Sequence, residues 1–193
     1  MPNWCSTAYA VEGDAQEIKS LYELMKKLED MEKPYVPNGF GTTWLRCLVN
    51  ALGGDWENVG CRGSWYNLEQ VGDVLKFNTE TAWAPCDETL ELILEKFPSL
   101  QYYYRTEEPG MVIYETNDSE GIYFPERYVL SILTPENEYF NEYFEELKNV
   151  FEWMNEKFGQ PITSFADMNK LEEKWQEQYN GAFCSLNEFE VID

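Results

Sequence analysis

Histidine is absent from all 193 residues of this chain. Its imidazole is the usual general base at neutral pH and a common metal ligand, so many hydrolases and metalloenzymes are disfavoured. The five cysteines never come within the roughly two to four residues of spacing that a zinc knuckle requires. Phosphate-binding glycine motifs are missing as well. We therefore predict no metal, no cofactor and no catalytic residue, and expect a protein that acts by binding.

Long apolar runs are also missing from the sequence. Nowhere do about 18 apolar residues follow one another, and the first residues lack the basic and apolar regions of a signal peptide. The odd number of widely spaced cysteines favours reduced thiols over disulfides. These features predict a cytoplasmic protein that does not act at a membrane.

Basic side chains are scarce, because 14 Lys and Arg stand against 36 Asp and Glu and give a net charge of −22. Such a charge repels nucleic acid and favours a basic protein surface as the partner. The hydrophobic content of 44% and aromatic content of 16% are those of a folded chain. We predict no direct binding of nucleic acid. Solubility is the competing explanation of the acidity.

Strand and helix patterns alternate over residues 1–133. A strand over residues 3–11 precedes a helix whose apolar residues recur between residues 18 and 31. Residues 33–60 interrupt the pattern with prolines and glycines around a short helix, and we interpret them as an insertion. A hairpin, a helix after Pro85 and further strands follow. This order predicts an α+β fold of the ferredoxin-like, split βαβ type, with two helices on one face of an antiparallel sheet.

Residues 134–193 are predicted to form an acidic, helical C-terminal extension. Apolar residues recur every three or four positions from Tyr139 to Phe158, which predicts one amphipathic helix over residues 136–158. A second helix is expected around residues 166–178, followed by a strand-like tail. The predicted domains are thus 1–133, with its insertion, and 134–193.

Several motifs resemble a known family. They are Met1–Cys5 (MPNWC), Gly60 with Trp65, Phe77–Pro85 (FNTETAWAP), and Phe97–Leu100 (FPSL) followed by Glu107–Gly110 (EEPG). In this order they resemble the YubB-like ferredoxin-fold family of phage and plasmid proteins, over roughly residues 1–125. The resemblance implies a ferredoxin-like fold and an origin in a mobile element. It supplies no catalytic residues.

The predicted helix over residues 136–158 carries a row of glutamates opposite its aromatic face. They follow steps of three, four or seven residues and are Glu138, Glu142, Glu145, Glu152 and Glu156. All the acids of this helix give about one charge per 5 Å, sparser than the one per 1.7 Å of duplex DNA. A mimic of nucleic acid therefore needs a second acidic row. Its candidates are Glu172, Glu173 and Glu177, or Glu107, Glu108 and Glu115.

Two functional hypotheses follow. The leading one is a non-enzymatic interaction protein of phage or mobile-element origin. It would inhibit a host defence nuclease, as an anti-CRISPR or anti-restriction protein, by occupying the nuclease's basic nucleic-acid channel. The alternative is a domain that binds or hydrolyses a carbohydrate or small molecule, using the region of Trp44, Trp56, Trp65 and Trp83. A pocket formed by these tryptophans with two carboxylates would favour the alternative.

Cys86 is the one cysteine in a position that could activate a thiol, because it directly precedes a predicted helix start. A buried structural thiol is the favoured interpretation of this residue.

Overall fold

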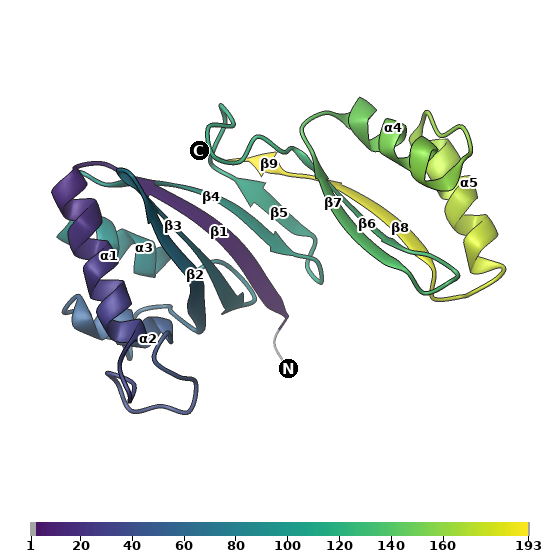
Figure 1. Cartoon of the computed structure of the whole chain (residues 1–193). Coiled ribbons are helices and arrows are strands. Elements are labelled where there is room, and N and C mark those ends of the chain that lie inside the picture. The colour runs from purple at the N-terminus through teal and green to yellow at the C-terminus, as the bar shows by residue number, and fades with distance from the viewer. Residues whose placement is uncertain (1–2, 193) are drawn as a thin grey trace. The chain divides into compact units, whose positions relative to one another are not determined.

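The computed structural model describes residues 3–192. Its helices and strands group into two compact units: unit 1 comprises residues 3–118 and Ile192, and unit 2 comprises Ser119–Val191. Both contain helices and strands (Figure 1), so the predicted α+β class is confirmed. The division after Asp118 differs from the boundary after residue 133 that the sequence patterns predicted.

Unit 1 begins with a strand and a helix and continues through the insertion to a hairpin, a third helix and two more strands. In chain order its elements are β1 (Trp4–Glu12), α1 (Ala15–Glu29), α2 (Leu45–Ala51), β2 (Gly63–Val71), β3 (Val74–Ala82), α3 (Asp87–Lys96), β4 (Gln101–Glu108) and β5 (Ile113–Thr116). The predicted hairpin corresponds to β2 and β3, and α2 is the short helix of the 33–60 insertion.

Local chemistry explains where α1 begins and which face it buries. The Asp14 carboxylate accepts hydrogen bonds from the backbone N–H groups of Gln16, at 2.9 Å, and Glu17, at 3.2 Å. These two groups lack partners within the helix, so the aspartate caps it. The buried residues of the helix recur every three or four positions and are Ile18, Leu21, Met25 and Leu28. This apolar stripe packs into the core of unit 1.

The strands of unit 1 form an antiparallel sheet in the order β2-β3-β1-β4-β5. Tyr9 of β1 stands opposite Phe77 of β3 and Tyr104 of β4. These rings belong to the same buried cluster as the apolar side chains of α1 and α3. Figure 1 shows the helices of unit 1 on one side of the sheet. Because side chains alternate between faces, the residues between these core positions lie on the opposite face.

Unit 2 has a second, smaller sheet with two helices. Its elements are β6 (Tyr128–Leu133), β7 (Tyr139–Phe144), α4 (Leu147–Phe158), α5 (Phe165–Gln176), β8 (Phe183–Glu188) and β9 (Glu190–Val191). The sheet order is β7-β6-β8, antiparallel throughout. Leu130 and Ile132 of β6 pack against Val150 and Met154 of α4 in one buried cluster. The predicted second helix, around residues 166–178, corresponds to α5.

The single helix predicted over residues 136–158 is wrong. Residues 139–144 form β7, and only Leu147–Phe158 are helical. Asn137 has a φ of +65° and its N–H donates to the Thr134 carbonyl, so a tight turn joins β6 to β7. Phe140 and Phe144 are four residues apart, a spacing that keeps two side chains on one face of a strand as well as of a helix. Their aromatic character favours the strand. Residues 134–193 are therefore not a helical extension, because strands make up part of them.

Candidate functional site

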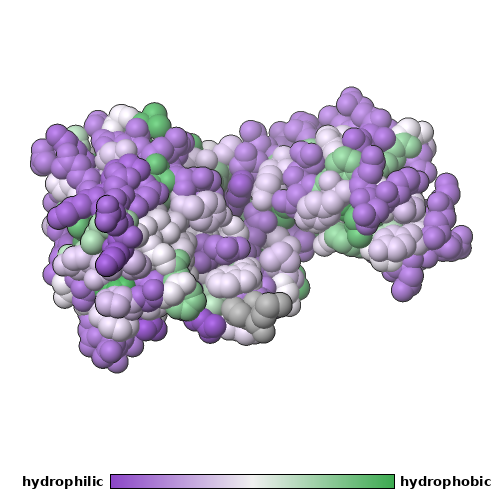
Figure 2. Space-filling view, turned by 60° about the horizontal axis from the view of Figure 1, so that its bottom comes forward, coloured by the Kyte–Doolittle hydropathy of each residue, from purple (hydrophilic) through white to green (hydrophobic). Residues whose placement is uncertain are grey.

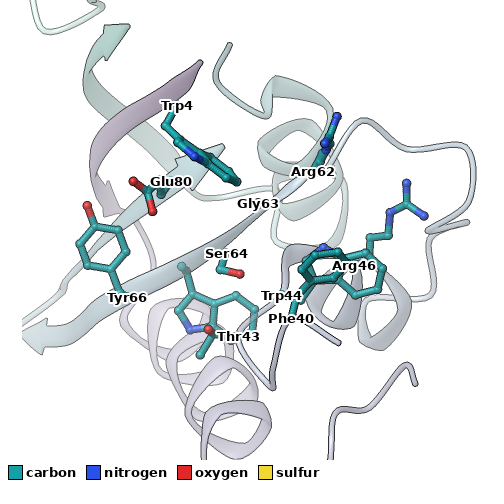
Figure 3. A pocket seen from close by; sticks show the side chains of 11 residues that line it. Trp4, Phe40, Thr43, Trp44, Arg46, Arg62, Gly63, Ser64, Tyr66 and Glu80 are labelled. Atoms are coloured by element: carbon teal, nitrogen blue, oxygen red, sulfur yellow. The ribbon is translucent and has the colours of Figure 1, made fainter. Parts of the chain in front are cut away.

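A cavity of unit 1 lies where the insertion meets the edge of the sheet. Its volume is about 640 Å³. We call it the aromatic groove and define it by Trp4, Phe40, Thr43, Trp44, Arg46, Arg62, Gly63, Ser64, Trp65, Tyr66 and Glu80. Figure 3 shows that these side chains come from β1, β2, β3 and the insertion.

Strand register brings one wall of the groove together. Glu80 of β3 stands opposite Ser6 of β1 on one side and Ser64 of β2 on the other. The Tyr66 hydroxyl lies 3.4 Å from Ser6 Oγ, and Trp4 lies two residues before Ser6 on the same face. This is the face of the sheet away from the helices, so the side chains remain accessible.

The insertion forms the opposite wall by pairing with the edge strand β2. The backbone N–H of Trp65 donates to the Thr43 carbonyl at 3.1 Å, and Trp44 forms an isolated antiparallel bridge with Ser64. These contacts satisfy backbone groups that an edge strand leaves unpaired. They also fix the position of Trp44 beside β2.

Aromatic rings make up much of the groove surface, and several are exposed. The exposed fractions are 49% for Trp4, 72% for Phe40 and 38% for Tyr66. Phe40 packs on Trp44 with ring centroids 5.2 Å apart. Large apolar side chains gathered in an open cavity are typical of ligand sites.

Arg46 is held among aromatic rings. Its guanidinium carbon lies 5.1 Å from the ring centroid of Trp44 and 5.4 Å from that of Trp56, both within the range of cation–π contacts. The guanidinium also affects the neighbouring Cys61 thiol: burial raises the pKa of Cys61, and the positive charge of Arg46 opposes this shift. The arginine therefore has a defined orientation at the rim of the groove.

The charge of the groove is opposite in sign to that of the chain. Arg46 and Arg62 carry two positive charges and Glu80 one negative charge, which leaves a net charge of +1 among the groove residues. The whole chain carries −22. Within residues 3–192, neither arginine forms a salt bridge. Their guanidinium groups are therefore not neutralised by a carboxylate of the described structure.

Trp65 contributes a polar atom without a partner. Only 1% of this residue is exposed, and its indole Nε1–H makes no hydrogen bond to any of the residues that the structure describes. Buried donors are almost always paired, by protein or by another molecule. The ring of Trp65 belongs to the core cluster on the helix side of the sheet, so this donor lies in the core and not in the open part of the groove.

The acidic residues predicted as a partner-binding site are distributed over several elements of unit 2. Glu138 lies in the β6–β7 connection, Glu142 in β7 and Glu145 in the bend before α4. Glu152 and Glu156 are exposed on α4, and α5 with its C-terminal end carries Glu172, Glu173 and Glu177. Glu142 stands opposite Leu130, on the face of the sheet that packs against the helices. The predicted single helical row is therefore wrong.

The tryptophans of the alternative hypothesis come together only in part. Trp44 and Trp65 line the groove, and Trp56 contacts Arg46 behind Trp44. Trp83 does not line it. Glu80 is the single carboxylate among the groove residues, so the pair of carboxylates that a glycosidase requires is missing from it.

Sequence reasoning missed Trp4, Phe40, Tyr66 and both arginines. Phe40 was the one residue that the sequence could have indicated. It stands between two glycines, in a segment rich in turns, where a large apolar side chain does not belong to the buried face of a helix or strand.

Cys86 does not have the properties of an activated nucleophile. It is the N-cap residue of α3, but its side chain is buried and makes no capping hydrogen bond. Burial raises the pKa of its thiol to about 12, and the neighbouring Asp87 carboxylate also acts in this direction. The thiol is thus neutral at pH 7, as expected for a structural cysteine. Within residues 3–192, no three side chains of the metal-ligating types His, Cys, Asp and Glu gather in one place.

Comparison of the chain with models of protein families, with curated proteins and with solved structures finds no match. In the described residues 3–192, every helix is too short or too polar to traverse a membrane. The function is therefore inferred from the geometry and charge of the two units.

Proposed function

We propose that this chain is a binding protein whose aromatic groove holds the planar ring of a small molecule. The observation that carries the proposal is the cluster of exposed aromatic rings around a cavity of about 640 Å³. Cavities of about 300–1,000 Å³ with apolar walls and a few polar groups are the usual size and character of small-molecule sites. The edge pairing of the insertion with β2 holds Thr43 and Trp44 beside this strand, where both line the groove.

The residues available in the groove support a proposal of binding rather than catalysis. The chain has no histidine, and the groove residues offer one carboxylate and no lysine. The Ser64 hydroxyl therefore has no histidine or lysine base among them, and Glu80 has no second carboxylate for acid–base work.

Replacing Trp4 by alanine is expected to weaken the binding of adenosine, a neutral planar-ring probe, by about tenfold. Stacking of a base on an aromatic side chain contributes about 1–3 kcal/mol, and about 1.4 kcal/mol corresponds to a factor of ten. Isothermal titration calorimetry measures the dissociation constant. Tyr139→Ala is the matched control, because Tyr139 is 60% exposed and belongs to unit 2.

Two outcomes would contradict this proposal. One is an affinity for adenosine that neither Trp4→Ala nor Trp44→Ala changes, because the probe then binds elsewhere. The other is a wild-type protein that binds cellotetraose but no planar-ring compound, which would favour the carbohydrate alternative.

For unit 1 we propose the ferredoxin-like arrangement and kinship with the YubB-like proteins of phages and plasmids. The support is the element order β1-α1-β2-β3-α3-β4, interrupted by α2 of the insertion, with the sheet order β2-β3-β1-β4, to which β5 adds a further strand. The motifs that carry the resemblance fall in β1, in β3 with the segment before α3, and around β4. A mobile-element origin and a cytoplasmic location belong to the same proposal.

A second candidate function is the binding of a basic protein surface, such as the nucleic-acid channel of a host defence nuclease. Hydrophilic residues cover most of the face seen in Figure 2. Glu145, Glu152, Glu156, Glu173 and Glu177 are exposed on unit 2. Since α4 and α5 carry most of these acids, they provide the two acidic elements that a nucleic-acid mimic needs.

Charge reversal tests this second function. The triple variant Glu152→Lys, Glu156→Lys and Glu173→Lys is expected to lose any inhibition of DNA cleavage by a purified CRISPR effector or restriction enzyme, because electrostatic association depends on these charges. The control reverses three exposed acids of unit 1, Glu57, Glu69 and Glu95, and changes the net charge equally. Equal inhibition by both variants, or inhibition that does not weaken with added salt, would rule out a defined acidic surface on unit 2.

A further inference from the structure

We infer that the aromatic groove selects a planar ligand that carries an anionic group, either a phosphate or a carboxylate, and that Arg62 and Arg46 bind this group. The inference rests on the proposed function of the groove and specifies its ligand class. A phosphate and a carboxylate present the same chemistry to a guanidinium, namely oxygens that accept hydrogen bonds and carry negative charge.

The charge distribution favours an anion at this one place. Two of the chain's 14 basic side chains lie in the groove, where Glu80 is the single acid. Screening reduces the influence of exposed charges beyond about 8 Å at physiological ionic strength. An anion in the groove therefore experiences the two nearby guanidinium groups more strongly than the distant carboxylates of an acidic chain.

The two arginines are prepared for this role in different ways. Arg46 is oriented by its contacts with Trp44 and Trp56, at 5.1 and 5.4 Å, so less freedom is lost when it binds. Arg62 is exposed at the residue before β2, and within residues 3–192 no carboxylate pairs with it. It can therefore turn its donors toward a ligand without breaking an existing salt bridge.

The arrangement of charged residues also determines the orientation of the ligand in the groove. Figure 3 shows Arg46 and Arg62 on one side of the groove and Glu80 and Tyr66 on the other, with Trp4 above. An anion near Glu80 would be repelled, whereas an amino group of a heteroaromatic ring could donate to that carboxylate. The anionic group therefore faces the arginines, and the ring lies toward Trp4, Tyr66 and Glu80.

Calorimetric titration of the full chain with matched probes tests this inference. Adenosine 5′-monophosphate and adenosine differ only by the phosphate, indole-3-acetate carries a carboxylate instead, and inorganic phosphate has no ring. We expect adenosine 5′-monophosphate to bind at least about tenfold more tightly than adenosine, as a charge-assisted hydrogen bond implies. Tighter binding of indole-3-acetate than of the monophosphate would identify a carboxylate as the preferred anion.

Arg62→Gln is expected to remove the difference between adenosine 5′-monophosphate and adenosine while the affinity for adenosine stays the same. Lys76→Gln is the matched control, because Lys76 is exposed on the same face of β3 and does not line the groove. The retained binding of adenosine shows that the Arg62 variant is folded. Trp4→Ala should weaken both ligands equally.

The outcomes separate the inference from the function on which it rests. Equal affinity for the monophosphate and adenosine in the wild-type protein would overturn the inference and leave a groove for neutral rings. An affinity difference that persists in Arg62→Gln and in Arg46→Gln would overturn it too. If none of the three ring-containing probes binds, the proposed function itself fails.

Discussion

Gly63→Ala is expected to destabilise unit 1 by about 3 kcal/mol or more and to abolish ligand binding in the aromatic groove. Gly63 begins β2 opposite Thr81. A Cβ atom at this position would overlap the Glu80 carbonyl oxygen and would lie 2.7 Å from the Cα atom of Thr81. These are backbone atoms of β3 that cannot rotate away, so the two strands must separate. Because Ser64 and Trp65 follow directly, the groove would change shape with the strand.

Gly39→Ala is the control for this variant. Gly39 lies in the same insertion that borders the groove, but a Cβ atom there would meet nothing within 4 Å. The stability of the Gly39→Ala variant and its affinity for the ligand should remain close to those of the wild-type protein. Thermal unfolding and titration with adenosine 5′-monophosphate measure the two effects. If Gly63→Ala unfolds at the same temperature as Gly39→Ala, then β2 and β3 do not approach each other closely at Gly63.

Phe77→Ala is expected to lower the unfolding free energy of unit 1 by about 3–5 kcal/mol. Phe77 is 1% exposed and stacks on Tyr9 with ring centroids 5.1 Å apart. Its removal leaves a cavity beneath α1 and α3 and exposes the neighbouring ring to a void. Native-state hydrogen exchange measures this loss for the amides of each unit separately.

Phe165→Ala provides the comparison for the core variant. Phe165 is 52% exposed at the start of α5, so its removal should cost far less. Protection of the β1, β3 and β4 amides should fall steeply in Phe77→Ala and stay unchanged in Phe165→Ala. A similar, small effect of both changes would mean that Phe77 is not at the centre of a packed core.

Local periodicity predicted most of the helices and strands of unit 1. The helix of Ile18 to Leu28 and the hairpin of β2 and β3 have patterns that only one kind of element explains. The pattern of Tyr139–Phe144 does not distinguish a helix from a strand, because Phe140 and Phe144 would lie on one face of either element. Pairing with β6 decides between the two, and pairing between strands cannot be read from one segment alone.

The candidate site was less predictable than the fold. Trp44 and Trp65 were anticipated as part of a tryptophan-rich region, but Trp4, Arg62 and Glu80 are widely separated in the sequence. They meet because β1 lies beside β3 and β3 beside β2 in one particular register. The glutamates of residues 138–156, by contrast, would form a single row only if residues 136–158 were one helix, and the structure has a strand and a shorter helix there.

The acidity of the chain and the positive charge of the groove are compatible. Repulsion by 36 acidic side chains keeps long polyanions away, since each added phosphate must approach more carboxylates. In the proposed function, a small ligand with one anionic group would meet Arg46 and Arg62 at short range in the groove. On this proposal, the overall charge disfavours large anions, and the residues of the groove determine which small anionic ligand binds.

Two-dimensional NMR of the indole N–H groups tests the groove as a ligand site most directly, because each of the seven tryptophans gives its own signal. On titration with adenosine 5′-monophosphate, the signals of Trp4 and Trp44, which line the groove, should shift. The signals of Trp153 and Trp175, which lie in unit 2, should stay in place. Shifts confined to Trp153 and Trp175, or no shift of any indole signal at saturating probe, would contradict a ligand site in the groove.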